Sequence, residues 1–146
     1  MRGQAFLATL TLILPACSET GPVAGEGRQY PAAGLVDSND PAMRAAMRQA
    51  RAGLPDFLER LENPPAGATV FAVKFPLGGW EHVWVTGIRR QDEAVVGRIA
   101  NDPLQAGHAR GDAVRVPIAA ISDWAWRDGK GRWHGYHTRQ AGPVAD

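Results

Sequence analysis

The sequence predicts an α+β fold in which an N-terminal kinked helix pair packs on a curved, partly barrel-like antiparallel sheet of about six short strands. Two observations predict this arrangement. The apolar residues first recur at steps of three and four, and from Thr69 onward they recur at every second residue. Turn-forming residues then divide the alternating part into short segments that follow one another directly, and such consecutive strands pair as an antiparallel sheet.

The helical part begins at Asp40-Pro41, because an aspartate can accept hydrogen bonds from the free amides of a first turn and proline suits the first helical position. Gly53 and Pro55 interrupt the apolar stripe that follows. Proline also disfavours the helical conformation of the residue before it. We therefore expect a helix near residues 41–52, a kink, and a second, short helix near residues 55–62.

Each expected strand is bounded by residues that favour turns. Gly78-Gly79 separates the first two strands, residues 101–111 form a loop, and Pro117 stops the strand after it. Asp128-Gly129-Lys130-Gly131 is a strong hairpin signal before the last strand. The expected strands cover residues 69–75, 81–88, 94–100, 113–116, 121–127 and 132–138.

The N-terminus resembles the signal peptide of a bacterial lipoprotein. Arg2 precedes an apolar run, and Leu14-Pro15-Ala16-Cys17 is similar to a lipobox, in which a cysteine behind a small residue is acylated. The run is far shorter than the ~20 residues that span a bilayer. We therefore expect residues 1–16 to be a lipoprotein signal peptide and the lipidated Cys17 to anchor the chain in a membrane.

This resemblance implies a lipid-anchored protein of the cell envelope that faces the periplasm, and Ser18 directly after the cysteine favours the outer membrane. Residues 17–39 are rich in Gly, Pro and Ala and have no period. We expect them to form the lipidated cysteine and a flexible tether that holds the domain near the membrane. In the alternative reading, Tyr30 and Leu35 dock on the domain, which spans residues 40–140.

Charge and cysteine content exclude several classes of function. Without residues 1–16 the chain has 15 basic and 15 acidic residues, and a neutral chain is not expected to bind nucleic acid. Cys17 is the only cysteine, so after acylation no thiol remains for a disulfide or a nucleophile. Residues 141–146 are expected to be a disordered tail.

Several short motifs, among them Glu81-His82-Val83-Trp84 and Ile121-Ser122-Asp123-Trp124, are similar in order and spacing to the YegJ-like family, the domain of unknown function 2314. The resemblance covers about residues 37 to 140. It implies no reaction, ligand or catalytic residue, and it marks the matched polar positions for inspection. The other matched segments are Asp40-x-x-Met43, Ala50-Arg51-x-x-Leu54-Pro55-x-Phe57, Val73-Lys74, Gly97, Asn101-Asp102-Pro103, Gly111-Asp112-x-Val114, Gly135-Tyr136 and Arg139.

Glu81 and His82 are the first candidates for binding. Neighbours in a strand point to opposite faces of the sheet, so the two cannot form one acid–base pair unless a bulge intervenes. His82 is interpreted either as a hydrogen-bonded histidine at the edge of the core or as a pocket histidine that titrates near neutral pH.

The matched charges Lys74, Asp123 and Arg139, with Asn101 as a matched polar neighbour, are further candidates. If the sheet curls, Lys74 or Arg139 can meet Glu81 or Asp123. The result is either a structural ion pair at a barrel rim or a polar pocket that accepts a small anion or a peptide terminus.

All five tryptophans fall between Trp80 and Trp133. Trp84 and Trp124 are expected in the core. Trp126 and Trp133 flank the hairpin, where they either pack across the strands or lie exposed and stack on sugars, peptides or lipid head groups.

No motif for a metal, a cofactor or a nucleophile is found. The histidines lack the His-Glu-x-x-His spacing and there is no cysteine ligand, so neither a metal nor a cofactor is expected. Ser122 lacks the Gly-x-Ser-x-Gly elbow and is interpreted, with Asp123, as fixing a bend. No catalytic residue is assigned.

The sequence therefore favours a non-enzymatic, membrane-anchored envelope lipoprotein that binds an envelope protein or a cell-wall glycan. One alternative is a small hydrolase or transferase centred on His82, with Glu81, Asp123 or Lys74 as its partner. A second alternative is a purely structural or stress-related lipoprotein without a small-molecule site.

Overall fold

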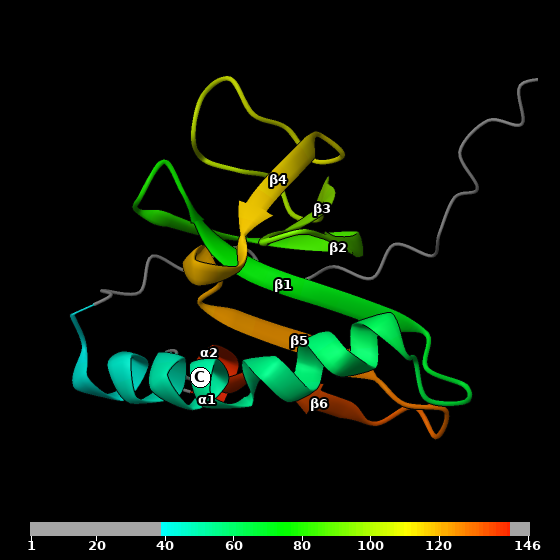
Figure 1. Cartoon of the computed structure of the whole chain (residues 1–146). Helices are drawn as coiled ribbons and strands as arrows, with labels where there is room; N and C mark the ends of the chain where they lie inside the picture. The colour runs from blue at the N-terminus through cyan, green and yellow to red at the C-terminus, as the bar shows by residue number, and fades with distance from the viewer. Residues whose placement is uncertain (1–38, 141–146) are drawn as a thin grey trace, which may run out of the picture.

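The computed structural model describes residues 39–140 (Figure 1). The expectations for the signal peptide, the tether and the tail lie outside these residues. No helix within the described part is long and apolar enough to cross a membrane. The elements are α1 (Pro41–Glu62), β1 (Val70–Leu77), β2 (Glu81–Gln91), β3 (Ala94–Ile99), β4 (Ala113–Pro117), the short 3₁₀ helix η1 (Ile118–Ala120), β5 (Asp123–Arg127), β6 (Trp133–Gly135) and α2 (His137–Gln140).

The strands of the described residues form one antiparallel sheet in the order β4-β3-β2-β1-β5-β6. This arrangement confirms the α+β prediction. The sheet is open, however, so the expected partly barrel-like closure is wrong. The edge strand β6 has only three residues and pairs only with β5, which leaves no ladder that could join it to β4.

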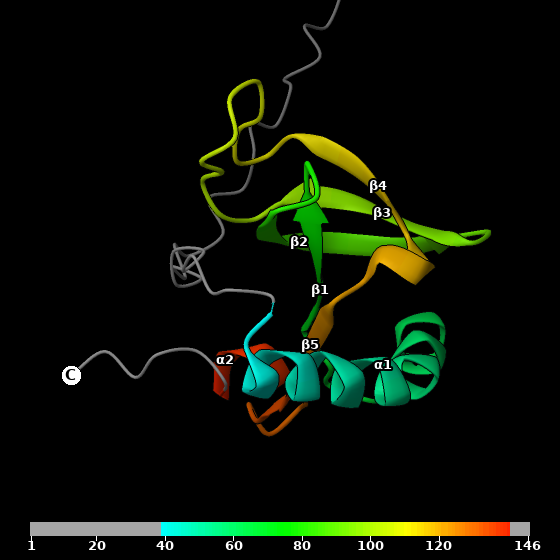
Figure 2. The same cartoon turned by 90° about the vertical axis from the view of Figure 1, so that its left-hand side faces the viewer.

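α1 packs across one face of the sheet, which we call the helix face (Figures 1 and 2). The opposite face is called the far face. Apolar residues at helical spacing on α1 meet the inward side chains of the strands and form the main core. This core comprises Leu54, Phe57, Leu58, Val73, Val85, Val95, Val116, Ile121 and Trp126.

The expected kinked pair of helices is one continuous helix. Its start is as predicted, since the Asp40 carboxylate accepts the Met43 amide at 2.9 Å. Pro55 lies inside the helix and has no N–H for the carbonyl four residues back. β5 supports this turn, because the Trp124 indole donates to the Ala50 carbonyl at 2.7 Å. Gly53 permits the approach, since a Cβ there would lie 2.8 Å from the indole Cζ2.

The last expected strand, residues 132–138, is wrong in its second half. Gly135 and Tyr136 adopt φ values of 81° and 59°, and this left-handed pair ends β6 after three residues. The chain then turns into α2. A positive φ is unusual for a bulky residue such as tyrosine, so contacts of the surrounding structure must hold the turn in place.

Candidate functional site

A polar cluster lies at the centre of the far face. The register pairs Lys74 of β1 with Trp84 of β2 on one side and with Asp123 of β5 on the other. Directly paired residues of neighbouring strands share a face, and His82, two residues before Trp84, shares it as well. The structure thus brings Lys74, His82, Trp84 and Asp123 together in one place.

Asp123 holds the C-terminal turn against this cluster. Its carboxylate is fully buried. One oxygen accepts the Trp124 amide at 2.8 Å and the backbone and ring N–H groups of His137 at 3.3 and 3.1 Å. The other accepts the amide and the hydroxyl of Thr138 at 2.8 and 2.7 Å. All these donors come from the protein itself, so Asp123 is a structural hub and does not face a ligand.

Lys74 has a different position. Its ammonium donates to the Thr138 hydroxyl at 3.3 Å and lies 5.5 Å from the centre of the Trp84 ring. Within residues 39–140 it makes no ion pair shorter than 4 Å. Burial lowers the pKa of Lys74, and the charge of Asp123 opposes this shift only in part. Lys74 is therefore a cation that keeps donor capacity for a further acceptor.

His82 is tied to the same strand pair through Ser122. Its Nδ1 lies 2.8 Å from the Ser122 hydroxyl, which itself donates to the Lys74 carbonyl at 3.1 Å. A hydroxyl has one proton, so both bonds are satisfied when His82 donates from Nδ1 and leaves Nε2 as an acceptor. Burial, and then the nearby charge of Lys74, lower the pKa of His82, which keeps the ring neutral at pH 7.

Asn101 borders the cluster from the other side of Trp84. Its side-chain oxygen accepts the Trp84 amide at 2.8 Å, which extends the sheet beyond the end of β3. Its side-chain nitrogen is buried and has no hydrogen-bond partner among the described residues. A buried donor without a partner costs about 1–3 kcal/mol, so this nitrogen is a second donor with unused hydrogen-bonding capacity.

Aromatic rings continue the far face from Trp84 toward β6. The Tyr136 ring packs edge-on against Trp84 and Trp133, with both centroid distances 5.0 Å. The Arg139 guanidinium lies 5.7 Å from the centre of the Tyr136 ring. Arg139 and Trp133 therefore belong to the border of the cluster, on the side of the C-terminal turn.

Glu81 does not take part in this cluster. Its buried carboxylate accepts the amides of Leu104 and Gln105 at 2.8 and 3.0 Å. It therefore anchors the loop between β3 and β4. The expected alternation of Glu81 and His82 agrees with these separate partners, and the pairing of Glu81 with Lys74 or Arg139 is wrong because the loop amides occupy both carboxylate oxygens.

Of the two interpretations of Trp126 and Trp133, packing across the strands or an exposed pair, the structure shows Trp126 packed across the strands on Phe71 and His134. Trp84 is in the core as expected, whereas Trp124 is only partly buried and packs against α1. Trp126 is 7% exposed on the helix face and stacks on Phe71 at 5.9 Å, so it cannot form an exposed surface with Trp133. The two rings lie on opposite faces because they are offset by one residue across the hairpin. The exposed indole is Trp80, at 52%.

Two members of the cluster could not be recognised from the sequence pattern. His137 and Thr138 join it because the left-handed turn at Gly135 and Tyr136 folds the end of the domain back to Asp123. The resemblance to a family offered one signal, since it marked Gly135-Tyr136 as a matched segment. No group of three or more His, Cys, Asp or Glu side chains in residues 39–140 lies close enough to hold a metal ion.

Comparison with known proteins identifies one relationship. A model of the protein family described as "Uncharacterized protein conserved in bacteria (DUF2314)" matches residues 40–141. No curated protein and no solved structure matches the chain. The match covers every element of the described fold and the whole polar cluster.

Proposed function

This chain belongs to the family of uncharacterized bacterial proteins DUF2314, and from its polar cluster we propose a non-enzymatic binding module that takes a carboxylate group at Lys74. One observation carries the proposal. Lys74 is a partly buried cation whose neighbouring carboxylate, Asp123, is already engaged by five hydrogen bonds from the protein. A buried charge is costly unless it is paired, and an anionic ligand supplies the pair.

The neighbours of Lys74 favour a carboxylate. The free side-chain N–H of Asn101 and the ammonium of Lys74 flank Trp84, and both donate hydrogen bonds, as an anion requires. The aromatic rings of Tyr136 and Trp133 border the cluster and suit the apolar part of a ligand. The carboxyl terminus of a peptide combines an anionic group with an apolar part. An envelope protein or a cell-wall peptide presents such a terminus.

We extend the proposal to the location of the protein. The lipobox-like segment ending at Cys17 supports a lipid anchor in the bacterial envelope, with the binding domain in the periplasm. Cys17→Ser tests this part separately. Loss of radiolabelled palmitate and release from the membrane fraction are expected, and unchanged labelling contradicts the anchor without affecting the site at Lys74.

Binding at Lys74 can be tested because the sequence has only two lysines, Lys74 and Lys130. Protein labelled with ¹³C at the lysine ε-carbon gives one resonance from each. Titration with acetate and with acetyl-alanine should shift the Lys74 signal to saturation and raise the pKa of Lys74, since a bound anion favours the charged form. Lys130 is exposed on the β5–β6 hairpin, and its signal should stay in place.

Two variants complete this test. Lys74→Met should weaken binding of acetyl-alanine at least about 10-fold, the effect of a hydrogen bond to a charged group, while Lys130→Met should bind as the wild type does. Equal affinities of the two variants would contradict the proposal. Lys74→Met should keep or raise the stability of the fold, because it removes a costly buried charge, so a loss of binding cannot be attributed to unfolding.

The hydrolase alternative has one observation in its favour, the 2.8 Å contact of His82 with the Ser122 hydroxyl. The same hydroxyl donates its proton to the Lys74 carbonyl, so His82 is the donor in the pair and does not activate Ser122 as a base would. Binding is therefore the better supported function. Hydrolysis of p-nitrophenyl acetate that disappears in Ser122→Ala would reverse this order.

A further inference from the structure

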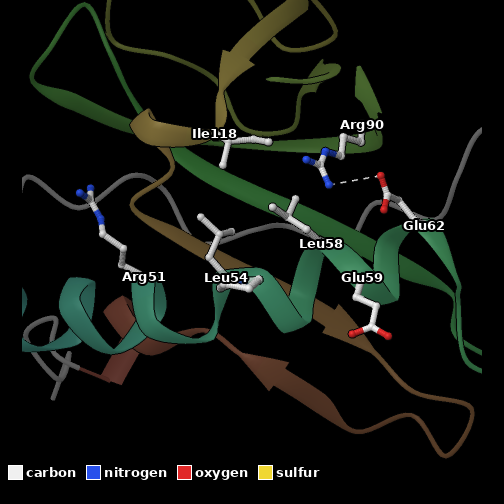
Figure 3. Close-up of a pocket in the computed structure, with 8 residues that line it drawn as sticks. Arg51, Leu54, Leu58, Glu59, Glu62, Arg90 and Ile118 are labelled. Carbon is white, nitrogen blue, oxygen red and sulfur yellow. Dashed lines mark hydrogen bonds and ion pairs between the residues drawn. The ribbon is translucent and has the colours of Figure 1, made fainter. Parts of the chain in front are cut away.

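A groove on the other side of the molecule runs along α1, separate from the cluster at Lys74 (Figure 3). Its volume is about 360 Å³, at the lower end of the range of about 300–1,000 Å³ for small-ligand sites. Leu54, Pro55 and Leu58 of α1 form one wall, and Ile118 of η1 lies opposite them. The middle of the groove is therefore apolar.

An ion pair closes one end. Arg90 of β2 donates to the Glu62 carboxylate at the end of α1, at 3.4 Å. Arg90 faces α1 because the β2–β3 register shifts between Thr86 and Arg89, where Gly87 has a φ of 59°. The shift reverses the alternation of β2, so Arg89 lies on the far face instead.

The other end carries a cation without a partner. Arg51 is exposed and lines the groove, and Figure 3 shows its guanidinium extending from α1 away from the Arg90–Glu62 pair. Within the described residues it makes no hydrogen bond or ion pair. Arg44 and Arg48 precede it at steps of four and three on the same side of the helix, so this end is positively charged.

We propose that the groove binds a single-chain anionic amphiphile, a medium-chain alkyl carboxylate whose head group meets Arg51 and whose chain lies over Leu54, Leu58 and Ile118. Charge complementarity fixes the orientation, since Glu62 at the closed end is neutralised by Arg90 and Glu59 adds a negative charge to the lining there, whereas Arg51 at the other end attracts a carboxylate. Eleven residue-to-residue steps of helix lead from Arg51 to Glu62, a rise of about 16 Å. An extended alkyl chain of ten carbons is about 12 Å long at ~1.3 Å per bond, so it fits within this length and leaves room for the contact between its carboxylate and Arg51.

The proposal predicts a dependence on chain length that simple anion binding lacks. Sodium butanoate, hexanoate, octanoate and decanoate, each below its micelle concentration, are titrated into the purified protein and followed by the ¹³C methyl signals of Leu54, Leu58 and Ile118. Affinity should rise about two- to fourfold per added CH₂, fourfold corresponding to complete burial. Arg51→Gln should weaken decanoate binding at least about 10-fold and leave 1-octanol binding unchanged.

Arg89→Gln is the matched control, because it removes the same charge from an exposed position on the far face. Equal effects of Arg51→Gln and Arg89→Gln, or an affinity that does not depend on chain length, would overturn the proposal. Tighter binding of acetyl-Leu-Leu than of decanoate would also overturn it and assign the groove to a peptide. Lys74→Met should bind decanoate normally, so this result is independent of the binding proposed at Lys74.

Discussion

Asp123 offers the most direct test of how the far face is assembled. Asp123→Ala removes the acceptor of five hydrogen bonds, from Trp124, His137 and Thr138. Thr138 is 3% exposed, so water cannot replace the lost carboxylate at its amide. We therefore expect the variant to fold less stably and to release α2 from the sheet.

The magnitude follows from the partners that remain. A hydrogen bond to a charged group contributes about 1.5–3 kcal/mol, and a buried donor left without a partner costs about 1–3 kcal/mol. These terms belong to one network and do not add fully. A loss of about 3–5 kcal/mol in the free energy of unfolding is expected, a large part of the ~5–15 kcal/mol typical of a domain.

Urea denaturation followed by tryptophan fluorescence measures this loss. With a denaturant slope near 2 kcal/mol/M, the midpoint should fall by about 2 M. The control is Asp102→Ala, since Asp102 is exposed and pairs with Arg110 at the surface, where such pairs contribute about 0–1 kcal/mol. A loss below about 1 kcal/mol in Asp123→Ala would refute the reasoning.

Three further predictions concern the rest of the domain. Gly53→Ala should destabilise the fold by about 1–3 kcal/mol in urea denaturation, although alanine favours helices, because its Cβ would lie 2.8 Å from the Trp124 ring; a gain in stability would contradict this contact. Glu81→Gln should release the loop of residues 101–111, visible as faster hydrogen exchange of the Leu104 and Gln105 amides, and unchanged exchange rates would disprove the anchor. Because burial and Lys74 lower the pKa of His82, the folded state binds this proton less readily than the unfolded chain does. Stability should therefore fall as the pH decreases from about 6.5 toward the lowered pKa of His82, a trend that His82→Gln should reduce and that an identical pH profile of the variant would exclude.

The local chemistry of the sequence was sufficient for much of the fold. The change of hydrophobic period after Thr69 predicted a helix followed by strands, and the structure has this order. Asp40 begins α1 as predicted because a cap depends only on residues within one turn. Pro55 was misread as a break, since the sequence cannot show that Trp124, 74 positions after Ala50, supports that turn.

The candidate site likewise has features that the local sequence pattern predicted and features that depend on contacts between distant residues. Alternation along β2 separated Glu81 from His82, because the period of a strand is a local property. Partners across strands depend on register and on the turn at Gly135 and Tyr136, which act over long distances in the chain. The turn at Gly135 and Tyr136 brings Thr138 to Asp123, and the strand register places Trp126 and Trp133 on opposite faces of the sheet.

The amino-acid sequence by itself determined the type of most segments, the family, and the absence of a cysteine in residues 18–146. Only the tertiary structure decided which polar groups are already satisfied and which remain available. Asp123 and Lys74 are both charged residues in neighbouring strands, yet the first is saturated by backbone and side-chain donors and the second is not. The physical reason is that hydrogen bonding is decided by positions in space, and folding sets these positions through contacts between residues distant in the sequence.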